Sequence, residues 1–425
     1  MRLRLYYIIL ALLYISGCCV ACNDSNKPAK ENTSDYRFSS YNGLVMAGYQ
    51  GWFSAQGCES NRGWYHYGFS GDNATIDFWP EMSEYSKKYV APFKMADGSD
   101  AYVFSSFDEE SVDLHFKWMQ EYGIDGVFIQ RFVSEVRGGA GKRHFNKVLE
   151  NALKAARKYD RAIAVYYDLS GSQPSDMEVL VNDWQELQTL FKLPDTVQNP
   201  TYVRHNGRML LGIWGVGFND NRRYSLIDAQ LMLERLKRNH EVSILLGVPY
   251  FWRSLSNDTE NNPVLHEIIK KNVDIVSPWA IGRYNNTTYA VASQLTGDLQ
   301  WCANNNLDYA PVVFPGFSWG NLRRTGIYDE IPRLGGDFLW QQVAGAKAAG
   351  AKSLYVAMFD EIDEGTAIFK CAEEGNLPVF EDPDKRFVGI EQGVGSDYYL
   401  WLVGEATKWI RGETGYGITK PVRNK

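Results

Sequence analysis

The chain is poor in the residues that would supply a disulfide framework or a metal site. It has six cysteines in 425 residues, and three of them lie together near the N-terminus: Cys18, Cys19 and Cys22. The other three, Cys58, Cys302 and Cys371, are far apart in sequence, which excludes a disulfide-rich scaffold and the paired spacing of zinc sites. The six histidines show no metalloprotease spacing. We therefore expect neither a metal nor a cofactor.

The chain also lacks a stripe rich in lysine and arginine. Its 44 basic residues are outnumbered by 51 acidic ones, and the formal net charge is −7. An acidic chain without a basic stripe is a poor nucleic-acid binder, so no such partner is expected. The hydrophobic share of 45% is ordinary for a soluble globular protein, whereas the aromatic share of 14%, with 13 Trp and 26 Tyr, is high.

The one uninterrupted apolar run of note lies at the N-terminus. Arg2 and Arg4 precede residues 5–15, a run too short for an ordinary transmembrane helix. It ends in Ile15-Ser16-Gly17-Cys18, which resembles a bacterial lipobox. We predict that residues 1–17 are a lipoprotein signal peptide, that Cys18 is lipidated, and that 18–38 include a polar tether. The protein would then be lipid-anchored in a bacterial cell envelope. An ordinary signal peptide cleaved near Ala21 is the alternative.

Eight short apolar runs alternate with amphipathic stretches along residues 39–425. Nearly continuous apolar runs are typical of parallel strands covered on both faces. The pattern predicts an α/β fold, a single (β/α)8 TIM barrel closed by a helix at Tyr398–Arg411, and we expect a monomer. Residues 51–107, rich in glycine and aromatics, are a long loop insertion after strand one that covers one end of the barrel. The predicted strands are Leu44–Gly48, Gly126–Ile129, Ala162–Tyr167, Met209–Trp214, Ile244–Val248, Asp274–Ser277, Tyr309–Phe314 and Ser353–Met358.

Four carboxylates follow the last predicted strand within five positions: Asp360, Glu361, Asp363 and Glu364. Such crowding is costly unless the charges have a role, and a close carboxylate pair suits cleavage of a glycosidic bond. Gly365-Thr366 favours a turn that brings Glu361 and Glu364 to the same side. Their α-carbons are then at most roughly 10 Å apart, which admits both retaining and inverting geometries. A structural acidic cluster or a cation site is the alternative.

Barrel enzymes place their chemistry at the carboxyl ends of the strands, and here those ends carry aromatics, arginines and carboxylates. Sugars stack their C–H faces on rings and bond their hydroxyls to polar groups. Alternatively, the aromatics simply fill the end of the barrel, and His66 is structural. The predicted sugar-binding residues are Tyr49, Trp52, His66, Arg131, Asp168, Trp214, Trp252, Arg253, Trp279 and Asp360.

Two competing motifs fail on their context. Residues 316–320 match the Gly-x-Ser-x-Gly nucleophile elbow, but an esterase triad needs a later histidine and the last one is His266. Residues 138–142 are similar to a phosphate-binding loop, yet Val136 occupies its first glycine position and Arg143 replaces Ser or Thr.

The acidic segment Glu361-Ile-Asp-Glu-Gly-Thr366 resembles the Glu-x-x-Glu-Gly-Thr motif of glycoside hydrolase family 99, the endo-α-mannosidases and endo-α-mannanases. The chain resembles more closely the bacterial proteins labelled family 71/99-like, from Tyr41 to Lys370 and beyond. The supporting segments are 48–53 (Gly-Tyr-Gln-Gly-Trp-Phe), 124–132 (Ile-Asp-Gly-Val-Phe-Ile-Gln-Arg-Phe), 167–171 (Tyr-Asp-Leu-Ser-Gly), 213–218 (Ile-Trp-Gly-Val-Gly-Phe) and 314–319 (Phe-Pro-Gly-Phe-Ser-Trp).

The resemblance implies a glycosidase that cleaves an α-linked, α-mannan-like glycan with retention through the neighbouring 2-hydroxyl. Glu361 would deprotonate that hydroxyl, and Glu364 would act as acid and then base. Family 99 has Trp-His between the glutamates, where this chain has Ile362-Asp363, so the sugar specificity is open. The alternatives are an inactive glycan-binding surface lipoprotein and a glycosidase of another specificity, such as an α-glucanase or a xylosidase- or arabinosidase-like enzyme.

Overall fold

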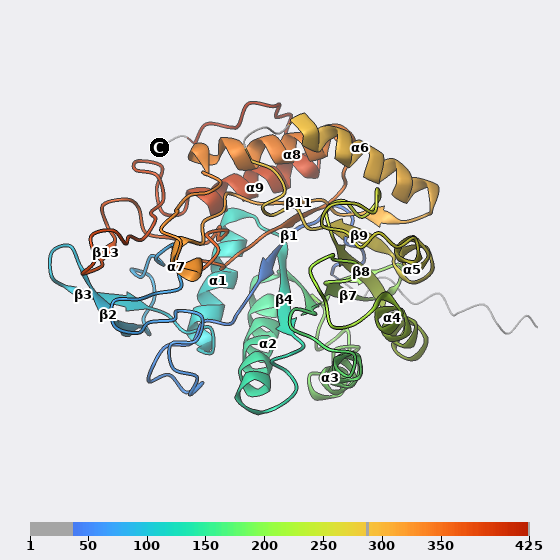
Figure 1. The fold of residues 1–425 in the computed structure, drawn as a ribbon, viewed down its shortest axis with the longest axis horizontal. Coiled ribbons are helices and arrows are strands. Elements are labelled where there is room, and N and C mark those ends of the chain that lie inside the picture. The colour runs from blue at the N-terminus through green and yellow to red at the C-terminus, as the bar shows by residue number, and fades with distance from the viewer. Residues whose placement is uncertain (1–36, 286–288, 424–425) are drawn as a thin grey trace, which may run out of the picture.

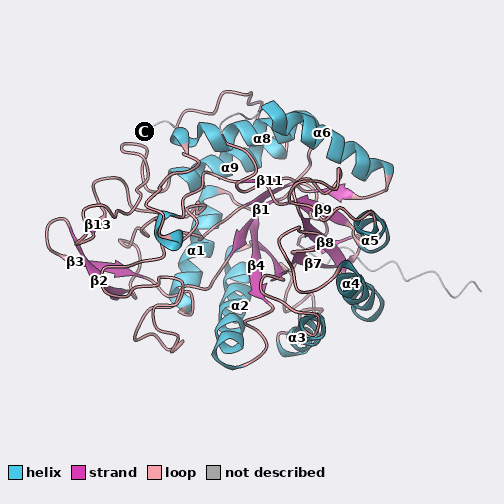
Figure 2. Ribbon diagram, viewed as in Figure 1, coloured by secondary structure: helices cyan, strands magenta, loops and turns pink. Residues whose placement is uncertain are grey.

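A computed structural model describes residues 37–285 and 289–423, and its centre is a ring of parallel strands. The order of the main sheet is β10-β9-β8-β7-β5-β4-β1-β12-β11, and every neighbouring pair along this path is parallel. Figures 1 and 2 show the helices arranged around these strands. The strands are β1 Val45–Tyr49, β4 Gly126–Phe132, β5 Ala162–Asp168, β7 Arg208–Trp214, β8 Ser243–Val248, β9 Ile275–Pro278, β10 Asp308–Tyr309, β11 Val312–Val313 and β12 Leu354–Val356.

The ring closes through the seventh predicted strand, which is divided in two. β10 pairs with β9, and β11 pairs with β12, on the other side of the gap. Pro311 lies between the two pieces and has no N–H to donate, which accounts for the interruption. Its carbonyl still accepts from Tyr355 N at 3.0 Å. The eight predicted strands are therefore all present, and the predicted (β/α)8 barrel is confirmed.

Large rings fill the interior of the barrel where glycines leave room for them. Tyr166 and Tyr355 face one another there, with ring centroids 5.5 Å apart. A Cβ on Gly212 would lie 1.9 Å from the Tyr166 ring, and one on Gly48 would lie 2.3 Å from the Tyr355 hydroxyl. Both rings are buried. The barrel is thus a packed core rather than a channel, and ligands must bind at its end.

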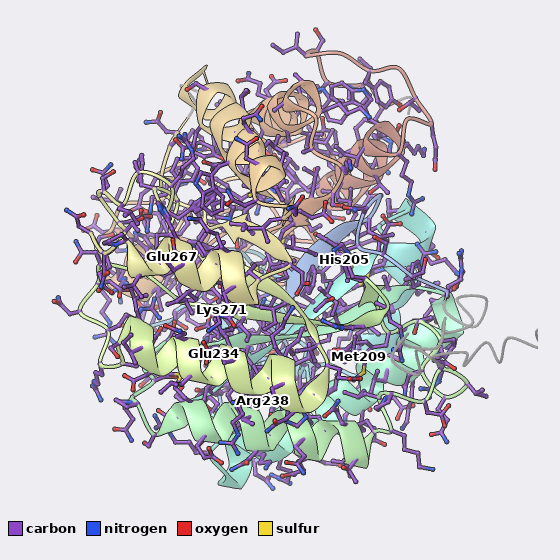
Figure 3. The ribbon with its side chains drawn as sticks, turned by 90° about the vertical axis from the view of Figure 1, so that its right-hand side faces the viewer. His205, Met209, Glu234, Arg238, Glu267 and Lys271 are labelled. Atoms are coloured by element: carbon purple, nitrogen blue, oxygen red, sulfur yellow. The ribbon has the colours of Figure 1, made fainter. Side chains whose placement is uncertain are left out.

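Helices cover the outside of the barrel. α4 begins with a capping box in which Ser225 and Asp228 satisfy each other's backbone N–H groups. An ion pair between Glu234 and Lys271, 2.7 Å long, joins α4 to α5 on the face seen in Figure 3. No helix of the described segments is long and apolar enough to cross a membrane. The helices are α1 Glu109–Tyr122, α2 Gly139–Tyr159, α3 Asp176–Leu190, α4 Leu226–His240, α5 Val264–Asn272, α6 Tyr289–Asn304, the short α7 Gly320–Arg323, α8 Asp337–Ala349 and α9 Tyr398–Ile410.

The insertion after β1 differs from the predicted loop because part of it is a sheet. β2 (Tyr89–Met95) and β3 (Asp100–Val103) pair antiparallel, and β13 (Pro378–Val379) adds a third strand from the end of the chain. The small sheet lies beside the barrel, at the left of Figure 1. Pro92 within β2 hides the strand in the sequence, and the pairing register shifts there, between Val90 and Lys94.

The many aromatics of the insertion pack against one another. Phe69 stacks on Trp79 at 5.7 Å and on Tyr67 at 5.2 Å, and Tyr67 contacts Phe53 at 5.0 Å. This packing replaces the regular hydrogen bonding that most of the insertion lacks, and it makes the insertion a fixed wall for the end of the barrel. The predicted signal peptide and Cys18 lie outside the described residues.

Candidate active site

The four acids occupy a tight turn at the carboxyl end of β12. Thr366 and Ala367 donate their N–H groups back to the carbonyl of Glu361, at 3.1 and 2.9 Å. The insertion holds the turn from outside, since Asp77 N and Phe78 N both donate to the carbonyl of Ile362, at 3.0 and 3.1 Å. The turn expected from Gly365-Thr366 is therefore present, and it lies at the end of the barrel where ligands bind in this fold.

Asp360 fixes the neighbouring strand end. Its two carboxylate oxygens accept from Gln50 N at 2.7 Å and from Gly51 N at 2.9 Å, just beyond β1. The side chain is fully buried, and this burial raises the pKa of Asp360 to about 7 against the opposing effect of the two bonds. Because both carboxylate oxygens accept a main-chain N–H, Asp360 holds the end of β1 in place. It has no oxygen without a partner to offer to a sugar hydroxyl.

Glu361 is buried with a donor on each carboxylate oxygen. Gln50 Nε2 donates to Oε1 at 2.6 Å, and Thr366 Oγ1 donates to Oε2 at 2.8 Å. Burial raises the pKa of Glu361 well above its usual value, and repulsion from Glu364 and Asp363 adds to the rise. The two donors oppose it, because they stabilise the ionised carboxylate.

Glu364 has the opposite surroundings. It is half-buried, and its carboxylate accepts no hydrogen bond from any described residue; only its main-chain carbonyl is bonded, to Ser318 N at 3.0 Å. Burial, together with repulsion from Asp363 and Asp168, raises its pKa to about 7, while the Arg323 guanidinium lowers it. A carboxyl group with a pKa near 7 suits a general acid that later acts as a base.

Asp363 joins the acid turn to the insertion through His66. His66 Nδ1 lies 3.0 Å from Asp363 Oδ2, and its ring stacks on Trp52 with centroids 3.6 Å apart and planes 8° from parallel. His66 has a left-handed backbone, φ 63°, that is fixed by a 2.6 Å bond from Thr75 Oγ1 to its carbonyl. So many constraints on one partly exposed histidine indicate a functional position.

The protonation of this pair follows from its burial. Burial lowers the pKa of His66 to about 3, with nearby Arg62 lowering it further, and burial raises the pKa of Asp363 to about 8. These shifts favour an uncharged pair at neutral pH, in which Asp363 donates its proton to Nδ1 and the imidazole carries its own proton on Nε2. His66 thereby presents an N–H donor on its partly exposed side. Asp363 Oδ1 is buried without a partner.

A second aromatic wall stands at the ends of β7 and β9. Trp214 and Trp279 meet edge to face at 5.6 Å, and the guanidinium of Arg222 lies 4.8 Å from the Trp214 ring. Asp168, at the end of β5, accepts from Ser170 N at 2.6 Å, and burial raises its pKa. Asp168 also raises the pKa of Glu364, so this wall lies in electrostatic reach of the acid turn. Trp214 Nε1 is buried without a partner.

Besides Asp360, four of the predicted sugar-binding residues have their side chains in other contacts. Tyr49 is fully buried, and its hydroxyl lies 2.8 Å from His115 Nδ1 on α1. Arg131 is also fully buried, in a 2.8 Å ion pair with Asp183 of α3. Both side chains point from their strands to the helix layer, because Gly48 and Gln130 take the inward positions just before them.

Trp252 and Arg253, beyond β8, are held by one acid of α6. Trp252 Nε1 donates to Asp298 at 3.3 Å, and Arg253 Nε donates to it at 2.8 Å. Trp252 is fully buried. These contacts bind the loop after β8 to the helix layer, and we leave Tyr49, Arg131, Trp252 and Arg253 out of the proposed sugar-binding set.

Several residues of the site were not among the predicted site residues. Gln50 and Thr366 are the donors to Glu361, and Arg222 covers Trp214. Trp319, whose ring lies 4.5 Å from the Arg323 guanidinium, stands beside the acid turn through its neighbour Ser318. The sequence contains a signal for Gln50, which follows β1 directly, and for Thr366, which belongs to the acidic motif. It contains no signal for Arg222, which lies eight residues beyond its strand in an irregular loop.

No group of three or more His, Cys, Asp or Glu side chains in the described ranges is arranged to hold a metal ion. The geometry of the acid turn explains this locally. Asp360 and Glu361 spend all four oxygens on N–H and O–H donors, which point the wrong way for a cation site. What the arrangement offers instead is one buried carboxylate with two hydrogen-bond donors and one half-buried carboxyl without donors, between two aromatic walls.

The fold and site define a (β/α)8 barrel with a glutamate pair on the turn after its last strand. The sequence matches no protein-family model and no curated protein. Among solved structures it is similar to the GH99 endo-α-mannosidase of Bacteroides thetaiotaomicron in complex with bis-tris propane, at 16% identity and a TM-score of 0.60, covering 87% of this chain and 98% of that one.

A second structure of the Bacteroides thetaiotaomicron GH99 endo-α-mannosidase aligns at 15% identity and a TM-score of 0.59, over 87% of this chain and 98% of that one. A glycoside hydrolase-like protein aligns at 14% identity and a TM-score of 0.51, over 78% of this chain and 95% of that one. At these identities the similarity establishes the shared fold over almost the full length of the neighbours.

Proposed function

We propose that this protein is a glycoside hydrolase that cleaves an α-linked, α-mannan-like glycan with retention of configuration. The observation that carries the proposal is the contrast between Glu361 and Glu364 on one turn. Glu361 has two donors that stabilise its charge, and Glu364 has none. Two interacting carboxyl groups with raised pKa values share a proton near neutral pH, and we assign that proton to Glu364 because Glu361 alone has donors that stabilise its charge. The likeness of the fold to an endo-α-mannosidase supports the substrate class.

These protonation states suit catalysis through the neighbouring hydroxyl. Glu361 accepts the proton of the sugar 2-hydroxyl while that oxygen attacks the anomeric carbon, and Glu364 donates its proton to the departing glycosidic oxygen. Glu364 then takes a proton from water as the water oxygen attacks the anomeric carbon and opens the 1,2-anhydro ring. Glu361 returns its proton to the 2-oxygen. Two displacements at one carbon give net retention, and both glutamates end as they began.

The two aromatic walls are the proposed sugar-binding surfaces. The Trp52–His66 stack stands on the side of Asp363, and the Trp214–Trp279 pair stands on the side of Asp168. The half-buried indole rings of Trp214 and Trp279 take the C–H faces of a sugar, while His66 Nε2 and Arg222 supply donors to its hydroxyls. Trp52 is buried between His66 and Phe132 and supports the His66 ring.

The proposal is tested by incubating the protein with α-mannans, α-glucans and complex glycans and by following the anomer first released with NMR. We expect products from an α-mannan with retained configuration. An inverted anomer would refute the neighbouring-hydroxyl route. Products only from other α-glycans would show that the substrate is not an α-mannan. Binding of glycans without turnover by the parent protein would favour a non-catalytic glycan-binding protein.

We also propose that the protein is a monomer held in a bacterial envelope by lipid on Cys18. The support is the lipobox-like sequence Ile15-Ser16-Gly17-Cys18, which lies outside the described residues. Expression of parent and Cys18→Ser proteins in a bacterial host tests this. The parent is expected in the membrane fraction with a mass increased by acylation, and an unmodified parent would overturn the anchor.

A further inference from the structure

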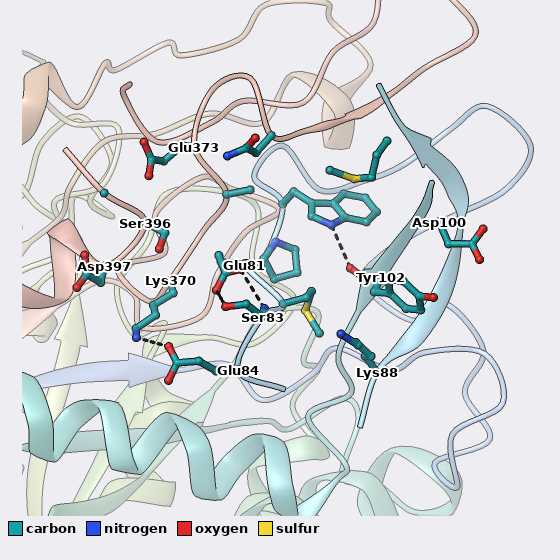
Figure 4. Close-up of a pocket in the computed structure, with 17 residues that line it drawn as sticks. Glu81, Ser83, Glu84, Lys88, Asp100, Tyr102, Lys370, Glu373, Ser396 and Asp397 are labelled. Carbon is teal, nitrogen blue, oxygen red and sulfur yellow. Dashed lines mark hydrogen bonds and ion pairs between the residues drawn. The ribbon is translucent and has the colours of Figure 1, made fainter. Parts of the chain in front are cut away.

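A groove of about 760 Å³ lies between the small sheet and residues from the segment 370–397, apart from the acid turn. Figure 4 shows its two walls, with Lys88, Asp100 and Tyr102 on one side and Glu373, Ser396 and Asp397 on the other. Its volume is within the range of ligand-binding clefts. Glu361, Glu364 and the two aromatic walls of the candidate site do not line it.

The groove is preformed because hydrogen bonds tie its floor to the segment that follows the acid turn. Glu81 N donates to the carbonyl of Lys370 at 3.0 Å, and Ala372 N donates to that of Trp79 at 2.8 Å. Trp79 Nε1 donates to the carbonyl of Tyr102 at 3.0 Å, which joins the floor to β3. A ligand therefore meets a fixed surface and does not have to order a loop on binding.

The lining combines an apolar floor with hydroxyl, amide and carboxylate groups. Trp79, Met82, Met95 and Tyr102 supply the apolar part. Asn376 and Ser396 also line the groove, and their side chains make no hydrogen bond to any described residue. Rings and thioethers beside unused polar groups fit a ligand with alternating C–H faces and hydroxyls.

The charge of the lining selects among ligand classes. Five carboxylates and only two lysines line the groove. Three of the five carboxylates are paired with cations: Glu84 with Lys370, Asp100 with Lys94, and Asp397 with Arg423. Lys88 lies 5.2 Å from the Tyr102 ring. The lining therefore has no uncompensated cluster of either charge, and it offers no cluster of free cations to a phosphorylated or acidic ligand. A neutral polyhydroxylated chain fits best.

We propose that this groove binds a neutral segment of the glycan chain, as a second site on the polymer whose cleavage takes place at the acid turn. The ligand class rests on the proposed function. Two sites on one polymer raise the effective concentration of the chain at the catalytic turn, so the groove increases activity on long glycans and leaves short substrates unaffected.

The test compares Tyr102→Ala with Val379→Ala, a matched truncation of an exposed side chain on the same small sheet outside the groove. Retardation is measured in gels containing a soluble neutral α-mannan, with the acid turn blocked by excess short oligosaccharide. We expect the parent and Val379→Ala to be retarded equally, and Tyr102→Ala to lose about tenfold in affinity. Tyr102→Ala should keep the parent activity on short substrates.

A second variant guards against misfolding of the first. Asn376→Ala removes an exposed amide with no partner in the described structure, so its unfolding midpoint should equal that of the parent while polymer binding falls a few-fold. Equal retardation of all variants, no retardation of the parent, or binding of oligolysine instead of the glycan would each overturn the proposal. Glycan hydrolysis with no groove binding refutes only the groove, and groove binding without hydrolysis refutes only the proposed activity.

Discussion

The two halves of the acid turn, Asp360-Glu361 and Asp363-Glu364, have the same carboxyl groups in opposite surroundings. The first half receives four hydrogen bonds on its four carboxylate oxygens, at 2.6 to 2.9 Å. The second half has one contact, between Asp363 and His66, and leaves Asp363 Oδ1 and the Glu364 carboxylate without donors. Burial raises the pKa of all four acids, and the two halves differ in the number of hydrogen-bond donors that their carboxylates receive.

This difference is the basis on which we propose that one short segment supplies both a base and an acid. A carboxylate supported by N–H and O–H donors keeps its charge at a lower pH, and one without donors keeps its proton. The donors to the first half come mainly from the end of β1, whereas the second half faces the insertion and Asp168. Distinct roles therefore depend on which element each half of the turn meets.

The largest effect is expected from neutralising one glutamate in each half. Glu361→Gln and Glu364→Gln should each lower kcat by about 10³-fold or more, because each removes a proton-transfer group from the reaction. The measurement is the initial rate on the best α-glycan substrate, with unfolding midpoints to check folding. The matched control is Glu413→Gln, which neutralises an exposed acid beyond α9 and should keep full activity. Full activity in either glutamate variant would refute the catalytic role proposed for that glutamate.

Asp360→Asn is expected to have the next largest effect, on stability rather than on chemistry. An amide cannot accept from both Gln50 N and Gly51 N, so one buried N–H loses its partner. Bonds to a charged acceptor contribute about 1.5–3 kcal/mol, and we expect the free energy of unfolding to fall by that order. Denaturant titration checks this. Asp363→Asn is the matched variant, and it should lower the free energy of unfolding much less at pH 7, where Asp363 is already protonated. Equal losses in the two variants would contradict the difference between the two halves of the turn.

The barrel was predictable from the sequence because its strands are nearly continuous apolar runs. The acid turn was also predictable, since Gly365-Thr366 follows the acids. The small sheet was not, because Pro92 interrupts its pattern and its third strand comes from residues about 280 positions later. That pairing depends on tertiary contacts, which a local pattern does not contain.

The main feature of the site that could not be predicted from the sequence is the direction in which each side chain points. Tyr49 and Arg131 follow strand ends just as Asp168 and Trp214 do, yet the first two point to the helices and the last two point inward. Alternation along the strand decides this, and its phase is set by which neighbour packs inside. Gly48 was the usable signal, because an inward glycine makes room for the Tyr355 ring and turns Tyr49 outward.

Gln50→Ala sharpens the contrast by removing one donor from the first half. Glu361 loses its 2.6 Å bond, so its pKa should rise and the acidic limb of the pH–rate profile should move to higher pH. We expect kcat at pH 7 to fall about tenfold, on the scale of one charged hydrogen bond. The matched control is Gln130→Ala, another buried glutamine at the adjacent strand end, which bonds Tyr355 instead of Glu361. A pH profile unchanged by Gln50→Ala would remove Gln50 from the site.

Asp363→Asn gives the smallest effect at pH 7 and the clearest test of the second half. The pKa of Asp363 is about 8 in the folded protein, and that of an aspartate in an unfolded chain is about 4. Between these values the native state holds a proton that the unfolded state has lost, so the free energy of unfolding falls as pH rises from about 4 to 8. The variant lacks this group, and its stability should fall less over the same range, both for this reason and because Asp363 no longer raises the pKa values of Glu361 and Glu364.

The same substitution should act on catalysis through Glu364. Ionised Asp363 raises the pKa of Glu364, and an amide does not, so the alkaline limb of the pH–rate profile should move to lower pH in Asp363→Asn. The rate at pH 6 should stay within a few-fold of the parent, because Glu364 is still protonated there. His66→Ala is the companion variant, since it removes the partner of Asp363 but leaves its charge. If both variants shift the alkaline limb equally, the effect comes from lost positioning by the His66–Asp363 contact and not from the Asp363 charge.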